Sequence, residues 1–240
     1  FDATDHWDQA AALSLPNKFF EPILGESGLL RRYNFTVTES TPLNQEVAVD
    51  PEMLGKVFET VVLTSEQAED YQAPNLRKAT GSYYTPRIVV NFIVREVLKD
   101  YLTARISGLS KERLGRLMEV DAAGGFTDDA RARLREAVSQ AEAESIRGHL
   151  NTFRACDPAI GSGAFALGLL HEIVNLHLLC ETAERGKDPR LSKPNLVYDL
   201  KKRAIENTIY GVDLQAKAVE ICKLRLWLSL IVDYQVDVDL

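Results

Sequence analysis

One carboxylate and two closely spaced glycines mark the part of the sequence best suited to hold a small charged ligand. The segment reads Asp157-Pro158-Ala159-Ile160-Gly161-Ser162-Gly163-Ala164-Phe165 and follows the short run Phe153-Arg154-Ala155-Cys156. Gly161 and Gly163 have no Cβ, so the backbone can turn sharply there and approach a ligand closely. A helix from about Ala164 would offer free N–H groups to an anion, and Asp157 at a strand end could hold a cationic amine. The segment predicts a strand, a glycine loop and a helix around a ligand site.

Two further segments carry related motifs, one on each side of the glycine loop. The upstream segment is Gly81-Ser82-Tyr83-Tyr84-Thr85-Pro86-Arg87-Ile88-Val89-Val90, and the downstream segment is Ile209-Tyr210-Gly211-Val212-Asp213-Leu214-Gln215-Ala216-Lys217-Ala218-Val219. In this order the three segments resemble motifs of adenine-specific DNA methyltransferases that use S-adenosylmethionine (SAM) and have the gamma motif order. The motif sequences most resemble those of type IIG restriction-modification enzymes and BREX phage-defence methylases. The resemblance covers roughly residues 50–105 and 150–233.

The resemblance implies a role for each residue of the expected SAM site. Asp157 would accept from the amine of SAM, Thr85 would donate to its carboxylate, and Asp213 would accept from both ribose hydroxyls. Leu214 would pack on the adenine ring, and Phe165 would wedge the glycine loop onto its helix. The amides around Gly161 to Gly163 would line the methionine portion of SAM. The rest of the expected site comprises Tyr84, Pro86, Pro158 and Ala159. A purely structural alternative makes Asp157 a helix cap and Asp213 a turn former, but the ligand role is favoured because both acids follow expected strands.

No catalytic residue is expected within this segment. Adenine methylation in these families uses an (Asn/Asp/Ser)-Pro-Pro-(Tyr/Phe) loop downstream of the second SAM motif, and the sequence contains no Pro-Pro pair. The chain opens at Phe1 and stops at Leu240, which suggests a segment of a longer protein. The isolated segment is therefore expected to transfer no methyl group, and double-stranded DNA is expected to bind through regions outside it.

Two other classes of protein remain open. Gly161-Ser162-Gly163-Ala164-Phe165-Ala166 also fits the dinucleotide fingerprint of an NAD- or FAD-binding oxidoreductase. That fingerprint expects its ribose-binding acid about twenty residues further on, whereas Asp213 lies 50 residues after Gly163. A non-catalytic interaction domain that retains the fold is the third possibility, since the catalytic loop is absent.

Composition favours an intracellular protein with a substantial core, and the resemblance implies that it is bacterial and cytoplasmic. The 240 residues are 45% hydrophobic and 26% charged, with a net charge of −7. The acidic balance, with a pI near 5.2, is unlike that of a protein that grips DNA phosphates by itself, and the run Lys201-Lys202-Arg203 is expected on a helix surface. Cys156, Cys180 and Cys222 lack the paired spacing of a zinc site, so no metal is expected and core positions are favoured for all three. The apolar stretch around Leu224–Val232 is too short to span a membrane.

The expected fold class is α/β, with a truncated Rossmann-like methyltransferase sheet preceded by a mainly helical N-terminal region. The expected domains are a mainly helical region at 1–75, the Tyr-Thr-Pro motif and its helix at 76–105, a helical insertion at 106–150 and a partial SAM-binding domain at 151–240. A sheet cut short would have an open edge, which invites non-physiological pairing between chains.

Individual elements are also expected from the hydrophobic pattern. A strand is predicted around Tyr33–Val37, and a helix is predicted to begin at Asp50-Pro51. One charged helix is predicted from Thr127 to about Ile146, largely exposed to solvent. A helix from Pro86 to about Leu102 is predicted to bury a wide stripe that comprises Ile88, Val89, Phe92, Ile93, Val97 and Leu98. Further helices are predicted at about Ala164–Cys180, Leu196–Ile205 and Ala216–Val232, with a loop at 183–195.

Overall fold

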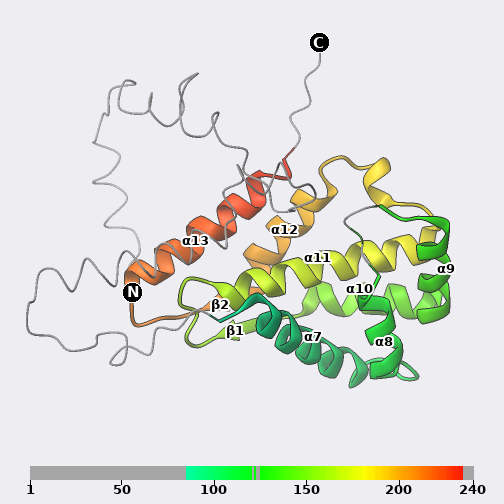
Figure 1. Ribbon diagram of the computed structural model, residues 1–240, viewed down its shortest axis with the longest axis horizontal. Coiled ribbons are helices and arrows are strands. Elements are labelled where there is room, and N and C mark those ends of the chain that lie inside the picture. Colours follow the sequence, from blue (N-terminus) through cyan, green and yellow to red (C-terminus); the bar gives the residue numbers. More distant parts are fainter. Residues whose placement is uncertain (1–84, 121, 123–124, 235–240) are drawn as a thin grey trace, which may run out of the picture. The chain divides into compact units, whose positions relative to one another are not determined.

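The computed structural model describes residues 85–120, 122 and 125–234. The strand predicted around Tyr33, the helix predicted from Asp50 and residue Tyr84 of the expected site lie outside these residues. The described elements are α7 (Arg87–Thr103), α8 (Lys111–Met118), α9 (Asp128–Ala137), α10 (Gln140–Thr152), β1 (Ala155–Asp157), α11 (Ala164–Arg185), the 3-10 helix η2 (Pro189–Leu191), α12 (Leu196–Asn207), β2 (Ile209–Gly211) and α13 (Ala216–Ile231) (Figure 1).

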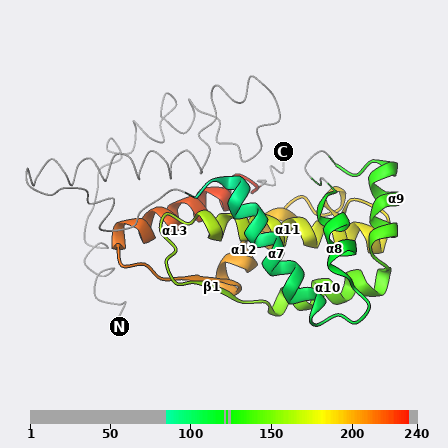
Figure 2. The same cartoon turned by 60° about the horizontal axis from the view of Figure 1, so that its bottom comes forward.

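Helix α11 is the centre of the hydrophobic core. Figures 1 and 2 both show it between the other helices, with α7 and α10 alongside. By length and composition α11 could cross a membrane, but 78% of its most apolar window is buried inside the protein, as in the core helix of a globular domain. It runs five residues beyond the predicted end at Cys180 and stops at Gly186, whose left-handed φ of 68° forms the C-cap.

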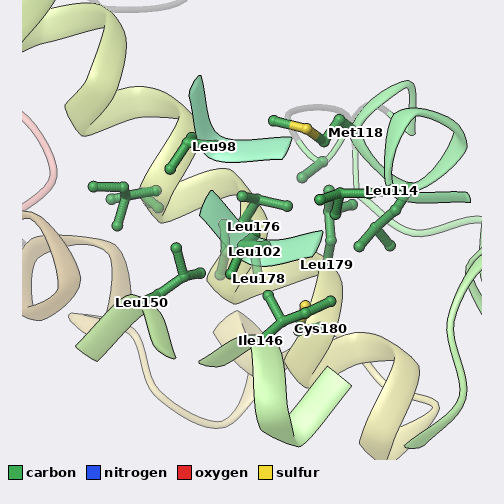
Figure 3. Packing of buried hydrophobic residues seen from close by; sticks show 14 of the residues in the cluster. Leu98, Leu102, Leu114, Met118, Ile146, Leu150, Leu176, Leu178, Leu179 and Cys180 are labelled. Atoms are coloured by element: carbon green, nitrogen blue, oxygen red, sulfur yellow. The ribbon is translucent and has the colours of Figure 1, made fainter. Parts of the chain in front are cut away.

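Apolar side chains from three helices, α7, α8 and α10, pack around α11. Its residues Leu176, Leu178 and Leu179 face side chains of α7, α8 and α10 (Figure 3). The partners labelled in that view are Leu98, Leu102, Leu114, Met118, Ile146 and Leu150. Because residues of 106–150 enter the same core as α7 and α11, this part of the predicted insertion is packed against the rest of the described chain.

The predicted buried stripe of α7 is wrong at most of its positions. The helix buries Val90, Val94, Leu98 and Leu102, whereas Ile88 is 81% exposed and Phe92 is 67% exposed. Of the predicted stripe only Leu98 lies in the core. The face is selected by α11, because Gly168 leaves room for Val90 to approach that helix closely. A broad apolar stripe predicts a helix but does not specify which part of it will be covered.

The single charged helix predicted from Thr127 to Ile146 is two helices. Val138 is extended, and Ser139 caps α10 in a reciprocal capping box with Glu142. Glu142 also accepts from both terminal nitrogens of Arg113 at 2.7 and 2.8 Å, which holds the pKa of Glu142 at about 2. The capping signal at Ser139 therefore divides a sequence that otherwise has continuous helical character.

Strands β1 and β2 form a short parallel pair. Ala155 pairs with Ile209 and Asp157 with Gly211, and the crossover between the strands runs through α11, η2 and α12. Long helical crossovers of this kind are required for parallel neighbours. Within the described residues the sheet has these two strands alone, so the larger Rossmann-like sheet stays a prediction.

The contact between α7 and α11 gives a matched pair of glycine substitutions. A Cβ at Gly168 would lie 2.5 Å from Cγ1 of Val90, a stiff β-branched side chain. Gly168→Ala is therefore expected to lower the free energy of unfolding by about 1–3 kcal/mol. Gly148→Ala is the control, because a Cβ at that position in α10 meets nothing within 4 Å and alanine is expected to raise stability by about 0.5–1 kcal/mol. Urea unfolding measures both, and equal effects would contradict the close contact.

Candidate ligand site at the carboxyl ends of the strands

Two carboxylates lie at the same edge of the strand pair. Asp157 is the last residue of β1 and pairs with Gly211, and Asp213 follows β2 by two residues. The pairing continues past the strands, since the N–H of Val212 donates to the carbonyl of Asp157 and that of Ile160 to the carbonyl of Val212, both at 3.0 Å. Ligands of open parallel sheets bind outside the carboxyl ends of the strands. Both acids therefore lie where a ligand of such a sheet would bind.

The glycine loop connects β1 to α11 through two left-handed residues. Gly161 has a φ of 53° and Gly163 a φ of 88°, a region that side chains with a Cβ rarely adopt. Gly163 is also sterically constrained, because a Cβ there would lie 2.5 Å from Sγ of Cys222 on α13. Gly161 has no such neighbour, so its requirement is conformational alone.

Asp213 binds the glycine loop directly. Its Oδ2 accepts from the N–H of Gly161 at 2.8 Å, and its Oδ1 accepts from the N–H of Gln215 at 2.8 Å. The N–H of Gly163 donates to the carbonyl of Ile160 at 2.9 Å. Both glycine amides therefore donate to acceptors within the protein. Asp213 therefore stabilises a turn, as the purely structural alternative predicts. A carboxylate has about four lone-pair sites, so this half-buried group can still accept hydrogen bonds from a ligand.

Asp157 does not cap α11, since Gly163 occupies the N-cap position. Its Oδ1 accepts from the N–H of Ala159 at 3.0 Å, a local turn. Within the described part of the chain, Oδ2 of Asp157 accepts no hydrogen bond. One oxygen of this strand-end carboxylate is therefore available to a ligand.

A groove of about 310 Å³ lies beside β1. Residues of α7, β1, the start of α11 and β2 form its walls, and the lining surface is mostly apolar. Three expected site residues, Asp157, Pro158 and Phe165, line it, whereas Gly161, Gly163, Asp213 and Leu214 do not. The other lining residues are Ile93, Val94, Val97, Phe153, Ala155, Cys156, Ala166, Leu169, Ile209 and Tyr210. The expected site residues thus form two sets, one that lines the groove and one around the glycine loop and Asp213. Asp157, at the end of β1, lies where the two sets meet.

The remaining expected residues lie on or near the surface. Thr85 is half-buried, and the carbonyl of Pro86 accepts from the N–H groups of Val89 and Val90 as α7 begins. Ala159 is exposed, and Leu214 has a relative exposure of 105%, which means that no described residue covers it. A flat ring could therefore reach Leu214 without displacing protein atoms.

Two residues of α13 contact the glycine loop, Arg225 through hydrogen bonds and Cys222 through packing, and Arg225 has no role in the expected site. Arg225 is 2% exposed, and its Nη1 donates to the carbonyl of Ser162 at 2.6 Å and to its Oγ at 3.2 Å. Burial raises the pKa of the Cys222 thiol to about 11, so this group is neutral and acts by packing. An arginine inside the apolar run Leu224–Trp227 was the available signal. Cys156, expected in the core, is exposed.

Comparison with known proteins gives one relevant similarity. The chain is 29% identical over 227 residues to a protein of Methanocaldococcus jannaschii named "Putative type II restriction enzyme and methyltransferase RM.MjaORFECS2P". The match covers 90% of this chain and 17% of that protein, so the chain corresponds to a small part of its relative. No protein-family model matches the chain. No solved structure matches it. The chain therefore shares sequence with one part of a protein whose name gives both a restriction enzyme and a methyltransferase.

The bond between Asp213 and Gly161 gives a test of the loop geometry. Asp213→Ala removes an anionic acceptor from two backbone N–H groups and is expected to lower the free energy of unfolding by about 1.5–3 kcal/mol. The amide of Gly161 is expected to exchange its hydrogen faster, which hydrogen exchange measured by mass spectrometry detects. Glu206→Ala on the exposed face of α12 is the control. Unchanged exchange around Gly161 would show that this bond does not hold the loop.

Proposed function

We propose that this chain is the SAM-binding segment of a DNA methyltransferase that modifies the exocyclic amino group of adenine in a restriction-modification or phage-defence system. The observation that carries the proposal is the convergence of Asp157, Asp213 and the glycine loop at one edge of a parallel strand pair. The order of the three motifs and the similarity to a restriction enzyme and methyltransferase give independent support. The working enzyme is proposed to act in the cytoplasm.

The groups at this edge fit the polar ends of SAM. Its ammonium and ribose hydroxyls need acceptors, and Asp157 and Asp213 provide carboxylate oxygens for them. Its carboxylate needs donors, for which the first-turn N–H groups of α11 and the hydroxyl of Thr85 are the candidates. Its adenine needs an apolar surface, and Leu214 is fully exposed. When bound, SAM supplies a methyl group activated by its sulfonium.

The same groups fit a dinucleotide less well. A pyrophosphate binds at a glycine-rich turn through free backbone N–H groups. In this chain the amides of Gly161 and Gly163 are both used internally. Two nearby carboxylates add negative charge where a pyrophosphate would bring more. These observations favour SAM over NAD or FAD.

The remaining parts of the function belong to regions outside the chain. We propose that the strand pair continues as a Rossmann-like sheet in the longer protein, and that the loop which holds the target amino group, with the surfaces that grip duplex DNA, lies beyond residue 240. The net charge of −7 supports weak DNA binding by this segment alone.

Ligand preference is the first test of the proposal. Isothermal titration calorimetry of the folded chain is expected to show binding of SAM and S-adenosylhomocysteine, with no preference for NAD. Asp213→Ala is expected to weaken SAM binding by about 1.5–3 kcal/mol, because a hydrogen bond to a charged group is lost. Tighter binding of NAD than of SAM would reject the proposed cofactor.

Methyl transfer is the second test. Residues 1–240 alone are expected to incorporate no labelled methyl group from SAM into DNA, because adenine must be flipped out and held by groups that this sequence lacks. The full-length protein is expected to label adenine. Robust labelling by the segment would show that its catalytic loop has been overlooked, and labelled cytosine would reject the adenine assignment.

A further inference from the structure

Arg225 is an unusual residue for its surroundings. It lies on α13 between Leu224 and Leu226, and it is the largest fully buried side chain among the described residues. Its 2% exposure places a permanent positive charge in a region of low dielectric. Burying a guanidinium is costly unless it is well bonded. The residues that it binds therefore indicate what it does.

The guanidinium holds the middle of the glycine loop. Nη1 of Arg225 donates to the carbonyl of Ser162 at 2.6 Å and to its Oγ at 3.2 Å, across 63 residues of sequence. Ser162 is 5% exposed and lies between the two left-handed glycines. Because both neighbours of Ser162 are glycines, the loop has little rotational restraint of its own. The bonds from Arg225 supply a restraint at the point where the backbone is freest.

Two further contacts to the loop come from the same part of the chain as Arg225. Asp213 holds the N–H of Gly161, and Cys222 packs against Gly163. These two residues and Arg225 all lie between the end of β2 and the middle of α13. The conformation of the loop after the first strand is thus fixed by the second strand and the helix that follows it.

We propose that Arg225 is a positioning residue for SAM, which orders the glycine loop through Ser162 and does not touch the ligand. This inference rests on the proposed function. A loop that is already ordered loses less conformational entropy when the ligand binds, so affinity rises without a new contact. In the proposed complex, the loop lines the methionine portion of SAM by its shape, because the amides of Gly161 and Gly163 are bonded within the protein. The effect of Arg225 is then confined to ligands that carry this portion.

The test uses ligand binding by the full-length protein. Arg225→Met keeps an apolar side chain of similar length, and Arg225→Lys keeps the charge with a single nitrogen. Lys223→Met is the control, because it removes a charge from the same helix at a side chain that is 66% exposed. For Arg225→Met we expect S-adenosylhomocysteine to bind about 10–100-fold more weakly. Adenosine, which lacks the methionine portion, is expected to bind Arg225→Met as it binds the control. The affinity of Arg225→Lys for S-adenosylhomocysteine is expected to lie between those of Arg225→Met and the control.

A purely structural role for Arg225 would give other results. Equal weakening of both ligands, or no weakening of either, would overturn the proposal. Hydrogen exchange of residues 158–166 in the absence of ligand provides a separate measurement. These residues are expected to exchange faster in Arg225→Met than in Lys223→Met. If the methionine variant does not fold, Arg225→Lys takes its place in this comparison. Failure of the unaltered protein to bind S-adenosylhomocysteine would reject the proposed function instead, and equal exchange in the variants would then reject the role of Arg225 in ordering the loop.

Discussion

The covering of α11 is the constraint on which the rest of the described structure depends. This helix is apolar on nearly every face, so α7, α8, α10 and α12 all have to pack around it. Its first residue follows directly on Gly163, which makes the C-terminal end of the glycine loop a part of the core. A change in the loop at that end would have to move the helix. The position of the Gly163 end of the loop therefore depends on hydrophobic burial along α11, some distance away from the site.

Buried polar contacts connect this core to the other half of the site. Lys201 on α12 is 4% exposed, although its basic run was expected on a helix surface, and its Nζ donates to the carbonyl of Ser229 at 2.8 Å and to its Oγ at 3.0 Å. Nζ also lies 2.6 Å from a carboxylate oxygen of Asp233. These contacts fix α13 against α12, and α13 in turn carries Arg225 to the loop. Removing one partner of a buried ion pair is strongly destabilising, whereas the intact pair adds little net stability. Its main effect here is to define the position of a helix.

The chemistry of the loop follows from how its backbone groups are used. Carboxylates at the ends of both strands and amides already bonded within the protein leave a site richer in acceptors than in donors. Such a site suits a ligand with an ammonium and hydroxyl groups better than one with several phosphates. The groove beside β1 adds apolar surface from Phe165 and the exposed side of α7. In the proposed function, this apolar surface would lie next to the bound methyl donor.

The sequence alone determined the order of elements and the local chemistry of the loop. Strand, glycine turn and helix at 155–185, the helices at 196–207 and 216–231 and the strand at 209–211 all follow from short-range signals, because glycine turns and hydrophobic periodicity act within a few residues. The capping box at Ser139 is an equally local signal, and it divides a segment that periodicity predicts as one helix. Tertiary structure alone decided which face of α7 is buried, the direction of the Gly161 amide and the contact from Arg225 to Ser162. Each of these joins residues far apart in the chain, and such partners are chosen by packing rather than by neighbouring sequence.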